Sequence, residues 1–134
     1  MAGRKMTKLL LDSVALIWWF TGNPKFSKPV RRHIEKGEFH VYVSAASAWE
    51  IATKVRQGKM PEAISLIAHF DDFLAEQDFI PLGITMAHAR LGGSLASAHK
   101  DPFDRLIAAQ AQIEDMPVVT CDAAFQGLGV RILW

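Results

Sequence analysis

Four acidic residues in this chain have the type and spacing that could support phosphodiester chemistry: Asp12, Glu50, Asp104 and Asp122. Carboxylates that gather in one place repel one another and are costly to bury in their ionised form. A divalent cation that prefers oxygen ligands, Mg²⁺ or Mn²⁺, removes that cost. Such an ion can activate a water molecule and stabilise charge on a phosphodiester. Metal-dependent hydrolysis is therefore one hypothesis for these residues.

Each of the four acids also has a structural explanation. Asp12 and Asp122 are of the residue type that helix N-caps favour. Glu50 stands four residues before Lys54, the favourable order for an exposed helical ion pair. Asp104 could simply interact with a helix dipole. Because caps gather at one edge of an α/β sheet in any case, the residues alone leave both explanations open.

The segment at residues 99–111 contains the start of a central helix. Asp101 suits the N-cap, Pro102 suits the first helical position, and Asp104 falls at the third. The run that follows is apolar almost all round, which predicts a buried helix. We expect Asp101 to build the helix start and Asp104 to be available as a metal ligand.

Strands and helices alternate along the chain. The apolar pattern predicts strands over residues 8–11, 41–43, 79–82, 117–120 and 130–133. Helices are expected over 14–20, from Ser27 to Gly37, from Ser44 to 57–58, from Pro61 through Leu74, and from Thr85 with a break or bend near Gly92 and Gly93. This order predicts an α/β fold with a parallel sheet covered on both faces. Sites in such sheets form beyond the carboxyl ends of the strands, where these acids fall.

Composition sets broad bounds on the protein. A chain of 134 residues is most simply one domain over 1–134, with 1–5 as an extension if Met6 is the native start. A single cysteine excludes an internal disulfide and fits a reducing, cytoplasmic setting. No apolar run approaches the roughly 20 residues that span a membrane. The five histidines lack zinc-type spacing, so we expect surface or core positions for them.

Four segments in the same order resemble PIN-domain proteins and, more narrowly, the VapC-type ribonuclease toxins of bacterial toxin–antitoxin pairs. They are residues 9–13 (LLLDS), 42–51 (YVSAASAWEI), 99–111 (HKDPFDRLIAAQA) and 119–125 (VTCDAAF). The resemblance implies a three-layer α/β/α sandwich with a central parallel sheet. It also implies an acidic pocket for Mg²⁺ or Mn²⁺ and endonucleolytic cleavage of RNA.

Site residues follow from the resemblance position by position. Asp12, Glu50, Asp104 and Asp122 match the four acids of the family, as catalytic residues and metal ligands. Ser13 stands where a hydroxyl usually supports the first acid, and Thr120 matches the hydroxyl before the last. We expect Asp12 and Asp104 to hold the principal ion, with Asp122 and Glu50 binding directly or through water. Related toxins often have Thr-His after the first acid, whereas this chain has Ser13 and Val14. That departure keeps a non-cleaving PIN-like RNA- or protein-binding domain open as the alternative.

Partners follow partly from the resemblance and partly from charge and aromatic residues. The family implies an RNA substrate, a VapB-type antitoxin and a homodimer. Adjacent helical residues such as Trp18 and Trp19 point about 100° apart, so unless the buried face is wide we expect this helix to contribute to a partner surface. Cationic residues near the acidic segments are the candidates for RNA binding, or else a solvated helical face. They are Lys54, Arg56, Lys100 and Arg105.

Overall fold

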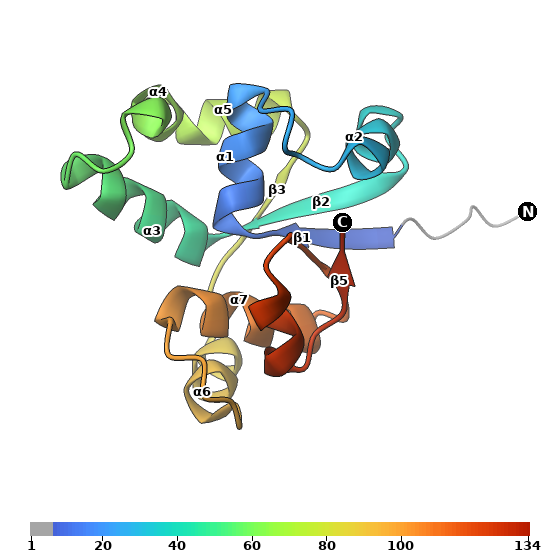
Figure 1. The fold of residues 1–134 in the computed structure, drawn as a ribbon, viewed down its shortest axis with the longest axis vertical. Coiled ribbons are helices and arrows are strands. Elements are labelled where there is room, and N and C mark those ends of the chain that lie inside the picture. The colour runs from blue at the N-terminus through green and yellow to red at the C-terminus, as the bar shows by residue number, and fades with distance from the viewer. Residues whose placement is uncertain (1–6) are drawn as a thin grey trace, which may run out of the picture.

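The computed structural model describes residues 7–134 and places a five-stranded parallel sheet between two layers of helices (Figure 1). The strand order is β3-β2-β1-β4-β5. The strands are β1 (Thr7–Leu11), β2 (Phe39–Ser44), β3 (Ile80–Leu82), β4 (Val118–Val119) and β5 (Ile132–Leu133). The predicted α/β class with a covered parallel sheet is confirmed. The predicted extension at 1–5 and the start at Met6 lie outside the described residues.

The central strand β1 is buried on both faces, and its side chains alternate between two cores. Leu9 and Leu11 pack in one core, while Leu10 packs in the other. Its neighbours follow the same alternation, with Val41 and Val43 of β2 beside Leu9 and Leu11. Successive side chains of a strand point to opposite faces, so a strand buried on both sides must be apolar throughout. This explains the unbroken leucine run that ends at Asp12.

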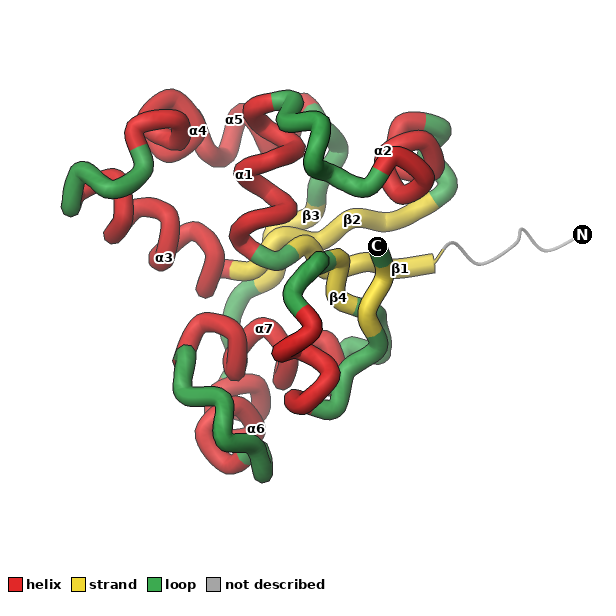
Figure 2. Tube along the Cα trace, in the orientation of Figure 1, coloured by secondary structure: helices red, strands yellow, loops and turns green. Residues whose placement is uncertain are grey.

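Helices cover the two faces of the sheet (Figures 1 and 2). One face is covered by α1 (Ser13–Thr21), α2 (Lys28–Glu35), α3 (Ala45–Arg56), α4 (Ile64–Ala68) and α5 (Phe70–Glu76). The other is covered by α6 (Met86–Ser94), α7 (Pro102–Ile113) and the 3₁₀ helix η2 (Ala123–Leu128). Within the described residues, none of these helices is long and apolar enough to cross a bilayer.

Two expected helices differ from the structure. The segment from Pro61 is divided into the 3₁₀ helix η1 (Pro61–Ala63), α4 and α5. Ala63, with φ −105° and ψ 4°, separates η1 from α4, and His69, with φ −131° and ψ 37°, separates α4 from α5. Apolar residues before and after this break share one core, so their spacing predicted the buried side but not the break. The helix from Thr85 is not broken at Gly92 and Gly93, since α6 runs through both to Ser94.

The aromatic residues of α1 pack inside the molecule rather than standing free. The Trp19 ring lies 5.4 Å from that of Phe26, and Phe20 lies 5.1 Å from Phe73. Trp18 contacts Trp134 at 5.9 Å. The side chains of Trp18, Trp19 and Phe20 are all half-buried. The wide buried face is therefore the arrangement that the structure adopts for this helix.

Candidate functional site

The carboxyl edge of the sheet brings the four predicted acids to one cavity of about 220 Å³. Asp12 directly follows β1 and Asp122 follows β4, the neighbouring strand. Glu50 lies in the second turn of α3, and Asp104 in the first turn of α7. The cavity is lined by these four residues and by Ser13, Val14, Lys54, Asp101, Cys121 and Phe125. Parallel strands that end at one edge account for this convergence.

Asp12 is both a helix cap and a buried acid. Its Oδ1 accepts a hydrogen bond of 2.7 Å from the Ala15 N–H, so the N-cap explanation is correct. The side chain is almost fully buried, and this burial raises its pKa from 3.8 to about 6. The Thr120 hydroxyl and the Ala15 N–H lower the pKa, whereas Asp104 and Asp122 raise it. Positive charge in the cavity would relieve the cost of ionising Asp12.

Glu50 forms the predicted helical ion pair but in a buried setting. Lys54 Nζ lies 3.0 Å from Glu50 Oε2, and the residue is only 8% exposed. The other oxygen, Oε1, is buried and has no hydrogen-bond partner among residues 7–134. A buried oxygen without a partner is costly, since buried polar groups are normally paired. Oε1 of Glu50 is therefore available to a ligand such as a cation, as far as residues 7–134 show.

Asp104 is paired with a histidine that the sequence did not indicate. His99 Nε2 lies 2.9 Å from Asp104 Oδ2. Burial raises the pKa of Asp104; the His99 hydrogen bond lowers it, and Asp101 and Glu50 raise it. Zinc-type spacing between histidines does not identify His99, because its partner is a carboxylate five residues later, at the end of an irregular segment.

The remaining acids at this edge both act as caps. Asp101 Oδ1 accepts from the N–H groups of Phe103 and Asp104 at 2.9 and 3.3 Å, which confirms it as the N-cap of α7. Asp122 Oδ1 accepts from Ala124 N–H at 2.9 Å and caps η2, although its side chain remains exposed. Capping uses one oxygen of each carboxylate and does not remove these residues from the cavity wall.

The two predicted supporting hydroxyls have different partners. Ser13 Oγ donates to Ser47 Oγ at 2.9 Å, so it joins the starts of α1 and α3. Thr120 Oγ1 accepts from the Asp122 N–H at 2.9 Å and also stabilises the charged form of Asp12. Thr120 therefore contacts both strand-end acids, whereas Ser13 acts through the helix that carries Glu50.

The cationic candidates for RNA binding divide into two kinds. All five N–H donors of Arg105 point to backbone carbonyls of the preceding segment: Gly92, Gly93, Leu95, Ser97 and His99. A guanidinium occupied in this way has no free donor for a phosphate, so the structure gives Arg105 a role in holding the segment before α7, and its RNA contact stays a prediction. Lys54 lines the cavity. Arg56 and Lys100 are exposed and lie close in sequence to the lining residues Lys54 and Asp101.

The donor set of this cavity suits a hard divalent cation. The acids offer oxygen ligands only, Glu50 Oε1 has no partner among the described residues, and burial opposes the ionisation of Asp12. No group of three or more acid, histidine or cysteine side chains within residues 7–134 is gathered closely enough to hold an ion by itself. Mg²⁺ usually keeps several waters and uses one or two protein carboxylates, so this spacing is compatible with it.

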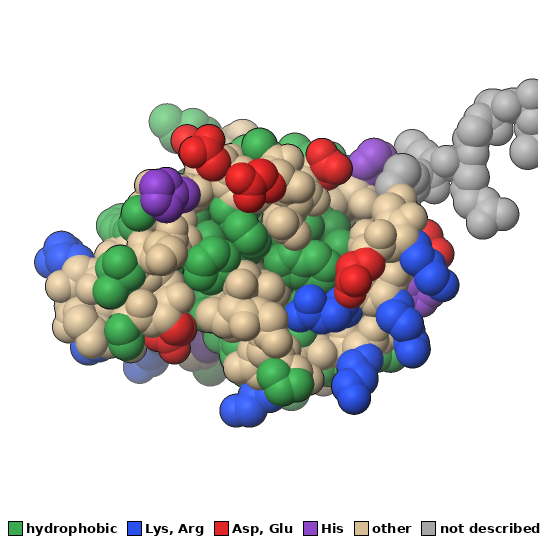
Figure 3. Space-filling model, turned by 90° about the horizontal axis from the view of Figure 1, so that it is seen from above, with side chains coloured by type: hydrophobic (Ala, Val, Ile, Leu, Met, Phe, Trp, Pro, Cys, Tyr) green, Lys and Arg blue, Asp and Glu red, His purple; other side chains and the backbone are tan. Residues whose placement is uncertain are grey.

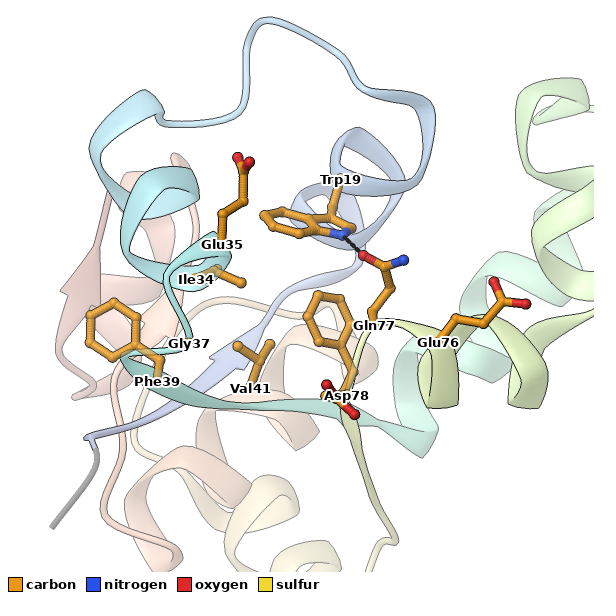
Figure 4. Close-up of a pocket in the computed structure, with 10 residues that line it drawn as sticks. Trp19, Ile34, Glu35, Gly37, Phe39, Val41, Glu76, Gln77 and Asp78 are labelled. Atoms are coloured by element: carbon orange, nitrogen blue, oxygen red, sulfur yellow. Dashed lines mark hydrogen bonds between the residues drawn. The ribbon is translucent and has the colours of Figure 1, made fainter. Parts of the chain in front are cut away.

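A larger cavity of about 380 Å³ lies elsewhere, against α1, α2 and the loop before β3. Its lining includes the apolar side chains of Trp19, Val41 and Phe79. Glu35 also lines it (Figure 4). Trp19 Nε1 donates to Gln77 Oε1 at 2.8 Å within this cavity. Figure 3, which looks onto this end of the molecule, shows apolar side chains at the surface with acidic and basic ones around them. None of the four predicted acids lines it.

Comparisons with known proteins agree with this arrangement. Solved structures with the same fold include a chain of VapBC2 from Rickettsia felis bound to a DNA fragment from their promoter, with a TM-score of 0.70, 14% identity, and 95% of this chain and 98% of that chain covered. A chain of a toxin-antitoxin complex from Klebsiella pneumoniae has a TM-score of 0.65 and 17% identity, with 94% of this chain and 96% of that chain covered. A chain of FitAcB from Neisseria gonorrhoeae has a TM-score of 0.61 and 18% identity, with 94% of this chain and 96% of that chain covered.

Family membership rests on the sequence. No curated protein matches the chain. The family model described as PIN domain matches residues 9–130, a span that includes all four acids of the cavity. Since this span covers most of the 134 residues, the chain belongs to the PIN domain family.

Proposed function

We propose that this protein is a Mg²⁺- or Mn²⁺-dependent endoribonuclease and the toxin of a cytoplasmic toxin–antitoxin pair. The observation that carries the proposal is the convergence of Asp12, Glu50, Asp104 and Asp122 on one cavity from four separate segments. Membership of the PIN family and a fold shared with chains of toxin–antitoxin complexes support it. In this proposal residues 1–134 act as a single domain.

Asp12 and Asp104 are the proposed principal ligands, with Asp122 and Glu50 binding directly or through water. When bound, the ion supplies a polarised water for attack on the phosphodiester and charge stabilisation as the phosphate accumulates negative charge. Burial makes the negative charge of Asp12 costly, and a bound cation would offset that cost, so the site favours positive charge.

The other residues of the cavity hold these groups in place. Asp101 fixes the start of α7, which carries Asp104, and Thr120 contacts both strand-end acids. The Lys54 ammonium stands in the cavity wall, where it would attract a phosphate of the substrate. Rigid mounting of charged groups before the substrate arrives is the main way in which a protein lowers the barrier to phosphoryl chemistry.

Cleavage of RNA by the purified protein tests this function. We expect cleavage with Mg²⁺ or Mn²⁺, loss of cleavage with EDTA, and loss with Asp104→Asn. Asp115→Asn is the matched control, because Asp115 is exposed, pairs with Arg131 on the surface and does not line the cavity. Cleavage that survives both chelation and Asp104→Asn would exclude a metal-dependent nuclease at this cavity.

A non-cleaving RNA- or protein-binding domain is the second candidate. Two of the four acids are already paired with a basic side chain, Glu50 with Lys54 and Asp104 with His99. Such pairs could make the acids purely structural, and Val14 replaces a polar residue common in related toxins. Absence of cleavage of any RNA together with absence of Mn²⁺ binding in calorimetry would favour this candidate.

An antitoxin protein and a second copy of the chain are the proposed protein partners. The structures that share the fold are named as toxin–antitoxin complexes, which supports the first. Light scattering of the purified protein tests the homodimer, with a monomeric mass as the contrary result. Co-expression with the product of a neighbouring short gene, followed by purification through a tag on that product, tests the antitoxin.

A further inference from the structure

An exposed tryptophan, Trp49, stands near the acidic cavity and contacts Phe103, which is partly buried against the core around Leu10. Trp49 of α3 is 66% exposed, the highest value among the exposed aromatic side chains of the described residues. Its ring meets that of Phe103 of α7 edge to face, with centroids 5.6 Å apart and planes at 83°. Tryptophan is enriched at binding interfaces, because its indole has a large apolar surface and a polar N–H, so an exposed indole beside a candidate site is a candidate contact.

The position of this pair relative to the acids follows from the sequence of the two helices. Trp49 directly precedes Glu50, and Phe103 directly precedes Asp104. Glu50 and Asp104 line the same cavity. Adjacent residues of a helix point about 100° apart, so the two rings lie beside the cavity and not in it. A nucleic-acid strand with a phosphate in the cavity would therefore pass next to the Trp49 indole.

A cationic side chain, Arg56, lies on the same side of α3 as Trp49. Arg56 follows Trp49 by seven residues, which places the two on one face of the helix about 10 Å apart along its axis. Arg56 is exposed, as is Lys100 in the segment before α7. An aromatic surface with positive charge beside it is the arrangement that single-stranded nucleic acids use, with bases on the rings and phosphates on the cations.

We propose that Trp49, held by Phe103, is a stacking surface for a nucleobase of the RNA substrate next to the scissile phosphate. This inference rests on the proposed nuclease function and adds a base-binding position to it. The edge-to-face contact fixes the indole before RNA arrives, so little side-chain entropy is lost on stacking. Stacking on an indole tolerates any base, and it contributes affinity without reading sequence.

Binding to two polyanions separates a base contact from a charge contact. Fluorescence anisotropy measures binding of a labelled single-stranded oligo(A) in EDTA, which prevents cleavage, and calorimetry measures binding of inorganic polyphosphate. We expect Trp49→Leu to weaken oligo(A) binding about 5- to 100-fold, the range for loss of one stacked base, and to leave polyphosphate binding unchanged. Trp49→Phe should retain most of the oligo(A) affinity. Arg56→Gln should weaken both ligands, and Ile64→Ala, which removes another exposed apolar side chain, should weaken neither.

Several results would overturn the inference. Wild-type oligo(A) affinity in Trp49→Leu would do so, as would an equal loss for both polyanions. Conversion of a wild-type dimer to a monomer by Trp49→Leu, with RNA affinity kept, would assign Trp49 to a contact between copies instead. Circular dichroism confirms that each variant is folded. If the wild-type protein cleaves RNA but Trp49→Leu binds normally, only this inference fails; if Trp49 affects oligo(A) binding but no RNA is cleaved, only the nuclease function fails.

Discussion

His99 Nε2 lies 2.9 Å from Asp104 Oδ2, and the same histidine is fixed through its backbone. Its N–H donates to Ser97 Oγ at 3.2 Å, and its carbonyl accepts from Arg105 Nη1 at 2.9 Å. The imidazole therefore reaches Asp104 from a segment that is itself held in place. This contact uses one of the two oxygens of Asp104 and restricts the direction of the other.

Loss of the imidazole donor should weaken divalent-ion binding. His99→Leu removes the hydrogen bond to Asp104, which raises the pKa of that carboxyl further and frees its orientation. We expect Mn²⁺ affinity, measured by calorimetry, to fall about 10-fold, as for other residues that orient a metal ligand. RNA cleavage at fixed Mn²⁺ should fall with it and recover as Mn²⁺ is raised.

Two variants control this experiment. His99→Gln keeps an N–H donor and should retain more Mn²⁺ affinity than His99→Leu. His33→Leu removes another histidine–carboxylate pair, with Glu38, on the exposed end of α2, and should have no effect on Mn²⁺. Equal Mn²⁺ affinity in His99→Leu and the wild type would show that His99 does not position Asp104.

Burial of Asp12 should make the protein less stable at neutral pH than at mildly acidic pH. Because the folded-state pKa is raised from 3.8 to about 6, the folded state binds the proton more tightly than the unfolded state. The free energy of unfolding from this group therefore falls as the pH rises from about 4 to 6 and is constant above that. A shift of about two pKa units corresponds to about 3 kcal/mol.

Asp12→Asn tests this effect, because asparagine also caps helices and carries no charge. Urea unfolding in EDTA should show Asp12→Asn more stable than the wild type by about 2 to 3 kcal/mol at pH 8. The difference should shrink as the pH falls through 6 toward 4. A constant difference across this pH range would contradict the raised pKa, and Asp115→Asn provides the exposed control.

The fold could be predicted from the sequence because its signals are local and repeated. The leucine run of β1 and the Asp101–Pro102 start of α7 each dictate their structure through nearby atoms. Parallel pairing then places Asp12 and Asp122 together, since β1 and β4 are neighbours. The gathering of the four acids thus followed from element order alone.

Features that depend on single backbone torsions or on irregular segments could not be predicted. The break at His69 separates two helices that share one apolar stripe, and periodicity does not register it. The segment at 95–100 has no regular structure, so neither the His99–Asp104 pair nor the five carbonyls around Arg105 could be inferred from spacing. Adjacent charged residues suggested an RNA contact for Arg105, whereas its donors are consumed by the backbone of this segment.

Gly92 and Gly93 should respond to alanine with opposite signs. A Cβ at Gly92 would lie 3.3 Å from the Arg105 carbonyl oxygen, so Gly92→Ala should force α6 away from α7 and cost about 1 to 3 kcal/mol. A Cβ at Gly93 meets nothing within 4 Å, so Gly93→Ala should gain about 0.5 to 1 kcal/mol from helix propensity. Urea unfolding measures both, and destabilisation by both variants to the same extent would show that packing against α7 is not what requires Gly92.

Arg105 should hold the segment that delivers His99 to the cavity. Arg105→Lys keeps the charge but offers at most three donors from one point, so at least two of the five carbonyls lose their partner. We expect a loss of about 2 kcal/mol in the free energy of unfolding, faster hydrogen exchange at residues 93–99, and weaker Mn²⁺ binding because His99 is no longer fixed. Arg131→Lys, at an exposed arginine paired with Asp115, is the matched control and should change none of these. Slower RNA cleavage by Arg105→Lys with unchanged exchange in this segment would instead indicate a direct contact of Arg105 with RNA.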